Sequence, residues 1–206
     1  MFSDPHPRGT CTTITARTGV KMPGICFRMM TTMFWLRDRI RPPERILDTM
    51  GIREGMCIVD YGCGPGSYLR GASELVGERG RVYAVDIHEL AIASVAKRIE
   101  KEGLGNVTPM LAKGYDSGLP EGVADLIYAL DMFFMIDDQG AFLAELRRIA
   151  APDAVLIIDD GHQPRERTRN SILSSPDWVI EEERTEFLLC RPARCECSAV
   201  YARKRN

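Results

Sequence analysis

The sequence predicts an α/β fold in which a doubly wound, mostly parallel sheet is covered by helices on both faces. Short, strongly apolar runs alternate with segments of helical periodicity between Ile58 and Ile158, and such runs are typical of parallel strands that are buried on both faces. Beyond Ile158 the pattern changes to two longer strand-like runs. These runs predict an antiparallel hairpin at one edge of the sheet.

The elements follow one another in a regular order along the chain. The expected strands are Ile58–Val59, Arg81–Val85, Val107–Leu111, Asp125–Leu130 and Ala154–Ile158. The expected helices are Tyr68–Val76, Leu90–Glu102 and a third, capped by Asp137 or Asp138, that runs to Ile149 and turns Phe142, Leu143, Leu146 and Ile149 toward the core. The hairpin is expected to pair Trp178–Arg191 with Cys195–Arg203 across a short connection at residues 191–194.

The N-terminal part precedes this alternation. Residues 1–24 contain three prolines and little periodicity, so we expect a flexible arm. Ile25–Ile40 carries apolar residues at helical spacing on more than one face, and a proline pair separates it from a short helix expected at Glu44–Met50. A chain of 206 residues suits one domain, so we expect residues 25–206 to form a single domain.

The composition argues against several classes of function. A formal net charge of −2 gives no general attraction for a phosphate backbone, so nucleic acid is not an expected partner. No apolar run reaches the roughly 20 residues of a membrane helix, and the N-terminus lacks the apolar core of a signal peptide. We therefore expect no membrane span and a cytoplasmic location. The seven cysteines have irregular spacings, which suits reduced thiols.

A glycine-rich turn follows the first strand. Its spacing is Gly62-x-Gly64-x-Gly66, whereas the dinucleotide fingerprint is G-x-G-x-x-G, and Ser67 stands where the third glycine of that fingerprint is expected. About twenty residues further on, Asp86 ends the second strand, where a carboxylate can accept hydrogen bonds from ribose hydroxyls. This layout predicts a nucleotide-type site, and the acid suits either a dinucleotide or another nucleoside cofactor.

Four segments occur together in the order Val59-Asp60-Tyr61-Gly62-Cys63-Gly64-Pro65-Gly66, Val82-Tyr83-Ala84-Val85-Asp86, Leu119-Pro120 before Ala124-Asp125-Leu126-Ile127-Tyr128, and Leu146-Arg147-Arg148-Ile149. Together they resemble the class I S-adenosylmethionine-dependent methyltransferases over about residues 44–160. The resemblance implies a Rossmann-like sheet of seven strands with an antiparallel last strand. It also implies S-adenosylmethionine as cofactor, S-adenosylhomocysteine as product, and a helical lid at residues 25–50 on a core at residues 51–206.

The resemblance further implies the residues that bind the cofactor. Asp60, Gly62 and Gly64 are expected along its methionine part, and Asp86 at its ribose. Many members of the family carry an acid before strand four that reaches adenine; Gly114 stands there in this chain, so Tyr115 or Asp116 is expected to replace it. The full expected set is Asp60, Gly62, Cys63, Gly64, Gly66, Asp86, Ile87, Tyr115, Asp116 and Asp131, in which Cys63 is a small filler rather than a nucleophile.

Candidate catalytic groups follow strands four and five, at the edge where open α/β sheets bind their ligands. A methyltransferase mainly aligns donor and acceptor, excludes water and removes a proton where the acceptor carries one. Asp131 and His162 are the expected catalytic residues. Alternatively, Asp131 caps the next segment or binds the cofactor, and His162 is a solvated loop residue.

The acids at this edge also resemble the Mg²⁺ ligands of metal-dependent, catechol-type relatives. The residues concerned are Asp131, Asp159 and Asp160, and hard oxygen ligands of this kind can lower the pKa of an acceptor hydroxyl. Acids also commonly end strands that face a positively charged cofactor. A metal is therefore not the favoured interpretation.

The methionine-rich and aromatic helix Ile25–Ile40 bears on the acceptor. As a lid it suits an apolar or aromatic small molecule, whereas packing on the sheet or a homodimer contact explains the same residues equally well. The leading hypothesis is a methyltransferase that acts on oxygen, nitrogen or carbon of a small-molecule acceptor. The alternatives are a non-catalytic S-adenosylmethionine-binding protein and a nicotinamide-dependent oxidoreductase.

Overall fold

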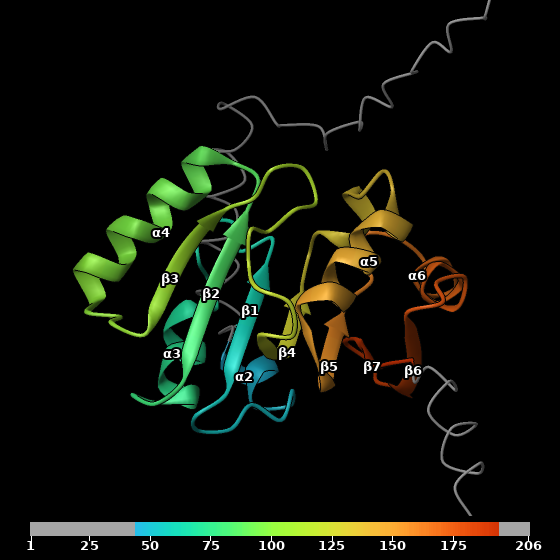
Figure 1. Cartoon of the computed structure of the whole chain (residues 1–206), viewed down its shortest axis with the longest axis horizontal. Helices are drawn as coiled ribbons and strands as arrows, with labels where there is room; N and C mark the ends of the chain where they lie inside the picture. Colours follow the sequence, from blue (N-terminus) through green and yellow to red (C-terminus); the bar gives the residue numbers. More distant parts are fainter. Residues whose placement is uncertain (1–43, 194–206) are drawn as a thin grey trace, which may run out of the picture.

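The computed structural model describes residues 44–193, which are built around one seven-stranded sheet (Figure 1). Across the sheet the strand order is β3-β2-β1-β4-β5-β7-β6. The first five strands of this order run parallel, and β7 is antiparallel to both β5 and β6. The bounds are β1 Cys57–Tyr61, β2 Arg81–Asp86, β3 Val107–Leu111, β4 Ala124–Ala129, β5 Ala150–Ile158, β6 Trp178–Glu183 and β7 Leu188–Pro192. The expected Rossmann-like sheet with an antiparallel last strand is confirmed.

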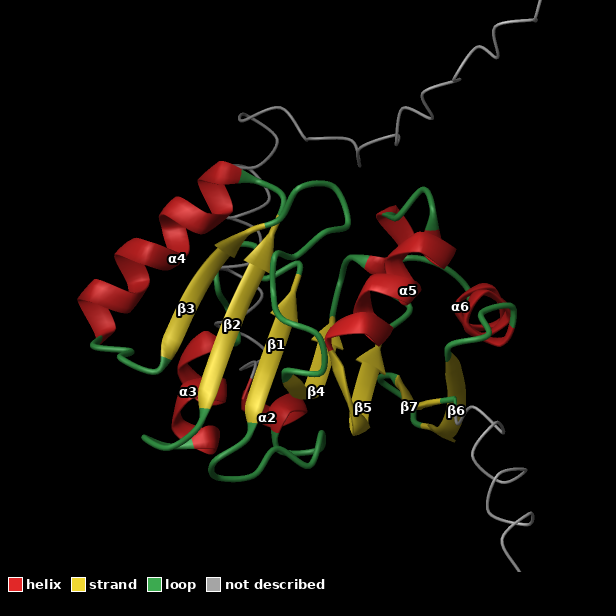
Figure 2. Ribbon diagram, viewed as in Figure 1, coloured by secondary structure: helices red, strands yellow, loops and turns green. Residues whose placement is uncertain are grey.

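Helices lie on both faces of this sheet (Figure 2). Successive strand residues point to opposite faces, so Ile58 packs with residues of α2, α3 and α4, while Val59 packs with residues of α5 and α6. This double burial explains why the central strands are apolar runs without alternation. The helices are α2 Glu44–Leu47, α3 Leu69–Val76, α4 Glu89–Glu102, α5 Gln139–Ile149 and α6 Arg165–Leu173, with a short 3₁₀ helix η1 at Phe133–Met135.

The α5 helix follows its sequence pattern closely. Asp138, and not Asp137, is the N-cap, because its carboxylate accepts a hydrogen bond from the Ala141 N–H at 2.9 Å. The four residues expected on the inner face are all fully buried: Phe142, Leu143, Leu146 and Ile149. Local capping and a 3.6-residue apolar period were therefore sufficient to predict this helix.

The hairpin exists, but its strands are not where the sequence pattern put them. Trp178–Arg191 was expected to be one strand, whereas it contains most of both β6 and β7 with a turn between them. The Arg184 N–H donates to the carbonyl of Phe187 at 2.9 Å and closes that turn. The charged residues that precede Phe187 are exposed or half-buried, so no apolar alternation continues through this segment. The connection expected at residues 191–194 is consequently not the hairpin turn.

Several N- and C-terminal expectations concern segments outside the described residues. These are the arm at residues 1–24, the apolar helix Ile25–Ile40 and the strand Cys195–Arg203. Within the described part, α2 covers the start of the short helix expected at Glu44–Met50. No helix between residues 44 and 193 is long and apolar enough to cross a membrane.

Candidate functional site

The glycine-rich turn leaves β1 at the carboxyl edge of the sheet in a conformation that requires glycine. Gly62 has φ 85°, and a Cβ there would lie 2.8 Å from Met132 Cγ. Gly64 has φ 51°, and a Cβ there would meet no atom within 4 Å. The turn therefore packs tightly against the segment after β4 at Gly62, while at Gly64, which is buried, no described atom lies within 4 Å of the Cβ position. A glycine backbone with such space beside it lets a ligand approach closely.

Asp86, at the end of β2, is bonded directly to this turn. Its Oδ2 accepts from the Gly64 N–H at 2.9 Å, and its Oδ1 accepts from the His88 N–H at 2.8 Å. Burial raises the pKa of Asp86, and hydrogen bonds from the N–H groups of His88 and Gly64 oppose that rise. The carboxylate thus joins the ends of two neighbouring strands, with Ile87 half-buried beside it.

Asp60 and Tyr128 form a buried polar pair at the base of the turn. The two residues are in register on β1 and β4; Asp60 is 2% exposed and Tyr128 fully buried. Neither Asp60 Oδ2 nor the Tyr128 hydroxyl has a hydrogen-bond partner among the described residues. Burial raises the pKa of Asp60 to about 8, against the opposing effect of the Tyr128 hydroxyl and with an added contribution from the charge of Asp86. Burial therefore favours the neutral form of Asp60 in the free protein.

Cys63 lies within the turn and is 5% exposed. Burial raises the pKa of its thiol well above the usual value, and the nearby acids Asp60 and Asp86 act in the same direction when they are ionised. A thiol that stays protonated is a poor nucleophile, which agrees with a packing role for this residue.

Tyr115 and Asp116 lie in a turn beside this site. The Tyr61 hydroxyl donates to the Tyr115 carbonyl at 2.7 Å, and the Tyr115 hydroxyl accepts from the Asp138 N–H at 3.0 Å. Asp116 is exposed, and its carboxylate accepts from the Gly118 N–H at 2.9 Å. Both residues are thus held by backbone contacts at the sheet edge, with Asp116 closer to solvent.

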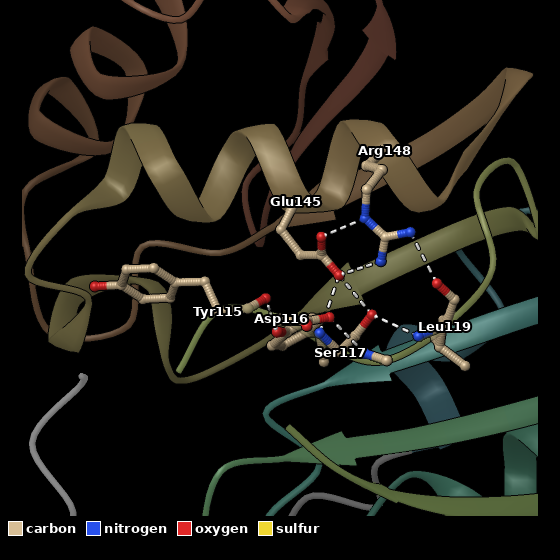
Figure 3. A network of polar contacts seen from close by, with 8 residues as sticks. Tyr115, Asp116, Ser117, Leu119, Glu145 and Arg148 are labelled. Carbon is tan, nitrogen blue, oxygen red and sulfur yellow. Dashed lines mark hydrogen bonds and ion pairs between the residues drawn. The ribbon is translucent and has the colours of Figure 1, made fainter. Parts of the chain in front are cut away.

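A polar cluster fixes this turn to α5 (Figure 3). Glu145 accepts from the Ser117 N–H at 3.0 Å and from the Ser117 hydroxyl at 2.6 Å. Arg148 donates to both Glu145 oxygens at 2.7 Å and to the Leu119 carbonyl at 2.8 Å. We call Ser117, Leu119, Glu145 and Arg148 the loop clamp. The sequence pattern did not reveal it, because its loop and helix partners are 28 or 29 residues apart in the chain.

The acids after β4 and β5 are brought near one another, but each is engaged in local contacts. The Asp131 N–H donates to Asp159 Oδ1 at 2.9 Å, and Asp131 is the one non-glycine residue between 44 and 193 with positive φ, at 57°. Asp160 pairs with Arg165 at 2.6 Å. Within the described chain, no three His, Cys, Asp or Glu side chains are grouped to hold a metal ion.

His162 is exposed at the same edge and stacks edge-on against Phe134, with ring centroids 5.1 Å apart. Gly161 precedes it with φ 54°, and a Cβ there would lie 2.3 Å from the Phe134 ring. Phe134 and Met132 were not predicted as site residues. The apolar run directly after the fourth strand was the signal that could have found them.

These features make one site with a definite chemical character. The glycine-rich turn, the Asp86 carboxylate at the end of the neighbouring strand and the buried Asp60 lie together at the carboxyl edge of the parallel strands. The carboxylate suits ribose hydroxyls, and a second, unpaired acid suits a positively charged group. The residues present fit a nucleoside cofactor that carries a cation.

Comparison with known proteins agrees with this geometry. Residues 59–158 match the family model described as a methyltransferase domain. The chain is 35% identical over 110 residues to nocamycin O-methyltransferase of Saccharothrix syringae, covering 53% of this chain and 39% of that protein. It is 22% identical over 135 residues to demethylmenaquinone methyltransferase of Geobacillus kaustophilus, covering 66% and 58%.

Among solved structures, the fold is similar to that of a SAM-dependent methyltransferase from Aquifex aeolicus. The TM-score is 0.69 and the identity 26%, covering 82% of this chain and 97% of that chain. By contrast, the chain spans less than two thirds of the length of either curated relative.

Proposed function

The chain belongs, through residues 59–158, to the class I S-adenosylmethionine-dependent methyltransferase family, and we propose that it transfers a methyl group from S-adenosylmethionine to a small-molecule acceptor. The names of the curated relatives, a nocamycin O-methyltransferase and a demethylmenaquinone methyltransferase, support a small-molecule acceptor. The methylated atom, a cytoplasmic location and a homodimer stay predictions from the sequence.

The observation that carries this proposal is the bond between Asp86 and the glycine-rich turn. Asp86 Oδ2 accepts from the Gly64 N–H at 2.9 Å, so the acid proposed for the ribose and the backbone proposed for the methionine part are held in fixed relation. Gly64, which has no described atom within 4 Å of its Cβ position, lies on the same turn. A pre-formed site of this kind binds its ligand with little ordering cost.

The cofactor supplies a methyl group that its sulfonium has already activated. The chain's own residues then need to orient the two reactants, exclude water and accept a proton. We propose that Asp131 and His162 serve the last step, His162 through an imidazole nitrogen that is exposed at the sheet edge. Tyr115 and Asp116 are proposed on the adenine side, where the loop clamp holds their turn against α5.

The acceptor is proposed to be apolar or aromatic on the evidence of the segment after β4. Met132 contacts Gly62 of the turn, and Phe134 contacts His162 and Gly161 after β5. Met135, in the same segment, is 49% exposed. This segment therefore presents methionine and aromatic side chains between the proposed donor site and the proposed base, a composition that suits flat apolar molecules.

The proposal is tested by incubating the protein with isotope-labelled methyl donor and a metabolite extract, followed by mass spectrometry. We expect label in a small-molecule product with the wild type and with Asp153→Asn, whose exposed carboxyl group lies near the start of β5. We expect at least tenfold less label with Asp86→Asn, because the amide removes the charged acceptor for ribose hydroxyls. Binding of the donor without transfer to any component would instead favour the non-catalytic alternative.

A further inference from the structure

The Asp60 and Tyr128 pair differs from the buried serine and threonine residues of the described chain. Ser73, Ser117 and Thr168 are buried too, and each takes part in a side-chain hydrogen bond of 2.6–2.8 Å. Asp60 Oδ2 and the Tyr128 hydroxyl lie close enough to affect each other's pKa, but they form no hydrogen bond of normal length and angle. Buried polar atoms are nearly always paired, so an orphaned pair requires an explanation.

The groups around this pair are acidic or neutral. Asp86 and Tyr128 are the residues whose charge or hydrogen bonding acts on Asp60, and Cys63, Tyr68 and Asp60 act on Tyr128. The Tyr68 ring lies edge-on to Tyr128 with centroids 6.1 Å apart. None of the described groups that act on Asp60 is a cation. The pair therefore combines unused acceptor capacity with a lack of positive charge.

The position of the pair connects it to the proposed donor site. Asp60 lies two residues before Gly62 on β1, and its carboxyl group feels the charge of Asp86. Asp86 in turn is bonded to Gly64. A positively charged ligand held by the turn and by Asp86 thus comes close to Asp60.

We propose that Tyr128 is a positioning residue of the donor site, whose hydroxyl orients the buried Asp60 carboxyl group, and that Asp60 releases its proton to solvent when a cationic ligand binds beside it. The proposal rests on the proposed function, because S-adenosylmethionine is the cationic ligand. Once ionised, the Asp60 carboxylate accepts from the Tyr128 hydroxyl and faces the cation. Both orphaned atoms then have partners.

Proton release makes donor binding dependent on pH, and the raised pKa of Asp60 in the free protein decides whether the affinity rises or falls with pH. Asp60 has a pKa of about 8 there, and binding selects the ionised form. Asp60 therefore contributes a rise in affinity as the pH rises toward 8, and this rise is separate from the donor's own α-amino group, which titrates only above about pH 7. Relative to the fully ionised carboxylate, one such proton weakens binding about tenfold at pH 7 and about a hundredfold at pH 6.

Titration calorimetry with S-adenosylmethionine from pH 6 to pH 9, in buffers of different ionisation enthalpy, measures both the affinity and the protons released. We expect the wild type to release most of one proton per site at pH 6 and pH 7, where the donor's own α-amino group stays mostly protonated. Asp60→Asn is expected to release none from this site and to keep only the pH dependence of the donor's amino group. Because the Tyr128 hydroxyl lowers the pKa of Asp60, Tyr128→Phe is expected to move the midpoint to higher pH and to weaken binding at pH 8 several-fold.

Tyr83→Phe is the matched control, since Tyr83 is a half-buried tyrosine of β2 that packs toward the opposite face of the sheet. Its midpoint should equal that of the wild type. Equal wild-type affinity at pH 6 and pH 7 without proton release would overturn the inference, because the donor's amino group stays mostly protonated in that range. An unchanged midpoint in Tyr128→Phe would overturn it as well. If either variant fails to fold, the wild-type profile still decides. A protein that does not bind the donor at any pH would contradict the proposed function instead.

Discussion

Replacing Glu145 by Gln tests whether the loop clamp holds the Tyr115 and Asp116 turn in place. Glu145 has a side chain that is 10% exposed and accepts two bonds from Ser117 and two from Arg148 (Figure 3). Glutamine keeps the length and the helix propensity of glutamate. It replaces one carboxylate oxygen by an N–H₂ group, which is a hydrogen-bond donor and therefore cannot accept the hydrogen bond that Arg148 or Ser117 donates to that oxygen.

The expected loss is worked from the bonds that cannot be remade. One charge-assisted hydrogen bond is worth about 1.5–3 kcal/mol, and we take about 1–2 kcal/mol because the Arg148 side chain is 39% exposed and solvent screens its charge. For a chain of this size that corresponds to a melting temperature lower by about 2–8 °C.

The loss also has a defined pH dependence. Burial alone would raise the pKa of Glu145, but the bonds from Arg148 and Ser117 lower it below 4.5. A carboxylate with a lowered pKa stabilises the fold above its unfolded value and loses that contribution as the pH falls through the folded value. The difference between wild type and Glu145→Gln should therefore be full near neutral pH and shrink below about pH 4.

Urea denaturation followed by circular dichroism measures the change, with Glu182→Gln as the matched control. Glu182, on β6, pairs with Arg184 in the following turn and has a side chain that is 50% exposed. Solvent screens this pair, so the variant should be about as stable as the wild type. The clamp reasoning is refuted if Glu145→Gln loses no more stability than Glu182→Gln at neutral pH.

Three further predictions follow from the same structure. Asp86→Asn should fold and weaken S-adenosylmethionine binding at least tenfold by calorimetry; an unchanged affinity would remove Asp86 from the ribose. Gly62→Ala should lower the free energy of unfolding in urea more than Gly64→Ala. Both alanines would need positive φ, which costs about 1–2 kcal/mol, but only the Cβ at position 62 would lie 2.8 Å from Met132. Gly64→Ala should still lose donor binding, and full binding by this variant would count against a role of the Gly64 backbone in holding the donor. The pKa of Asp60 is raised to about 8 on folding, so between about pH 4 and 8 the unfolded chain binds fewer protons, and this group makes the free protein less stable as the pH rises through that range. In thermal melts, Asp60→Asn should therefore lose this part of the decrease in melting temperature with pH. An equal decrease in wild type and variant would contradict the prediction.

The sequence predicted those parts of the fold that short-range patterns determine. Val107–Leu111 has the expected bounds although it is an edge strand in which only Val107 is buried. Its ends could be predicted because turn residues, Gly103 to Asn106 and Gly114, lie close on both sides of it. The hairpin was misplaced because strand-forming residues occur both before and after the exposed, charged turn that separates β6 from β7, so the segment resembles one long strand. The turn is closed by the hydrogen bond from the Arg184 N–H to the Phe187 carbonyl. Such a bond is not visible in residue types alone.

The candidate site divides in the same way. The glycine spacing and Asp86 were readable, since backbone conformation and strand ends leave local signals. The pairing of Asp60 with Tyr128 was not, because it requires β1 and β4 to be neighbours although they are far apart in the chain. Phe134 was likewise missed, since its contacts with Gly161 and His162 arise from the meeting of β4 and β5 at one edge.

Calorimetric titration of the protein with S-adenosylmethionine, S-adenosylhomocysteine and NAD tests the central claim most directly. The site at Gly64 and Asp86 predicts saturable binding of both sulfur ligands and no saturable binding of NAD. Asp86→Asn is expected to weaken both interactions together. Saturable binding of NAD, with no binding of either sulfur ligand, would contradict the assignment of this site to a methyl donor.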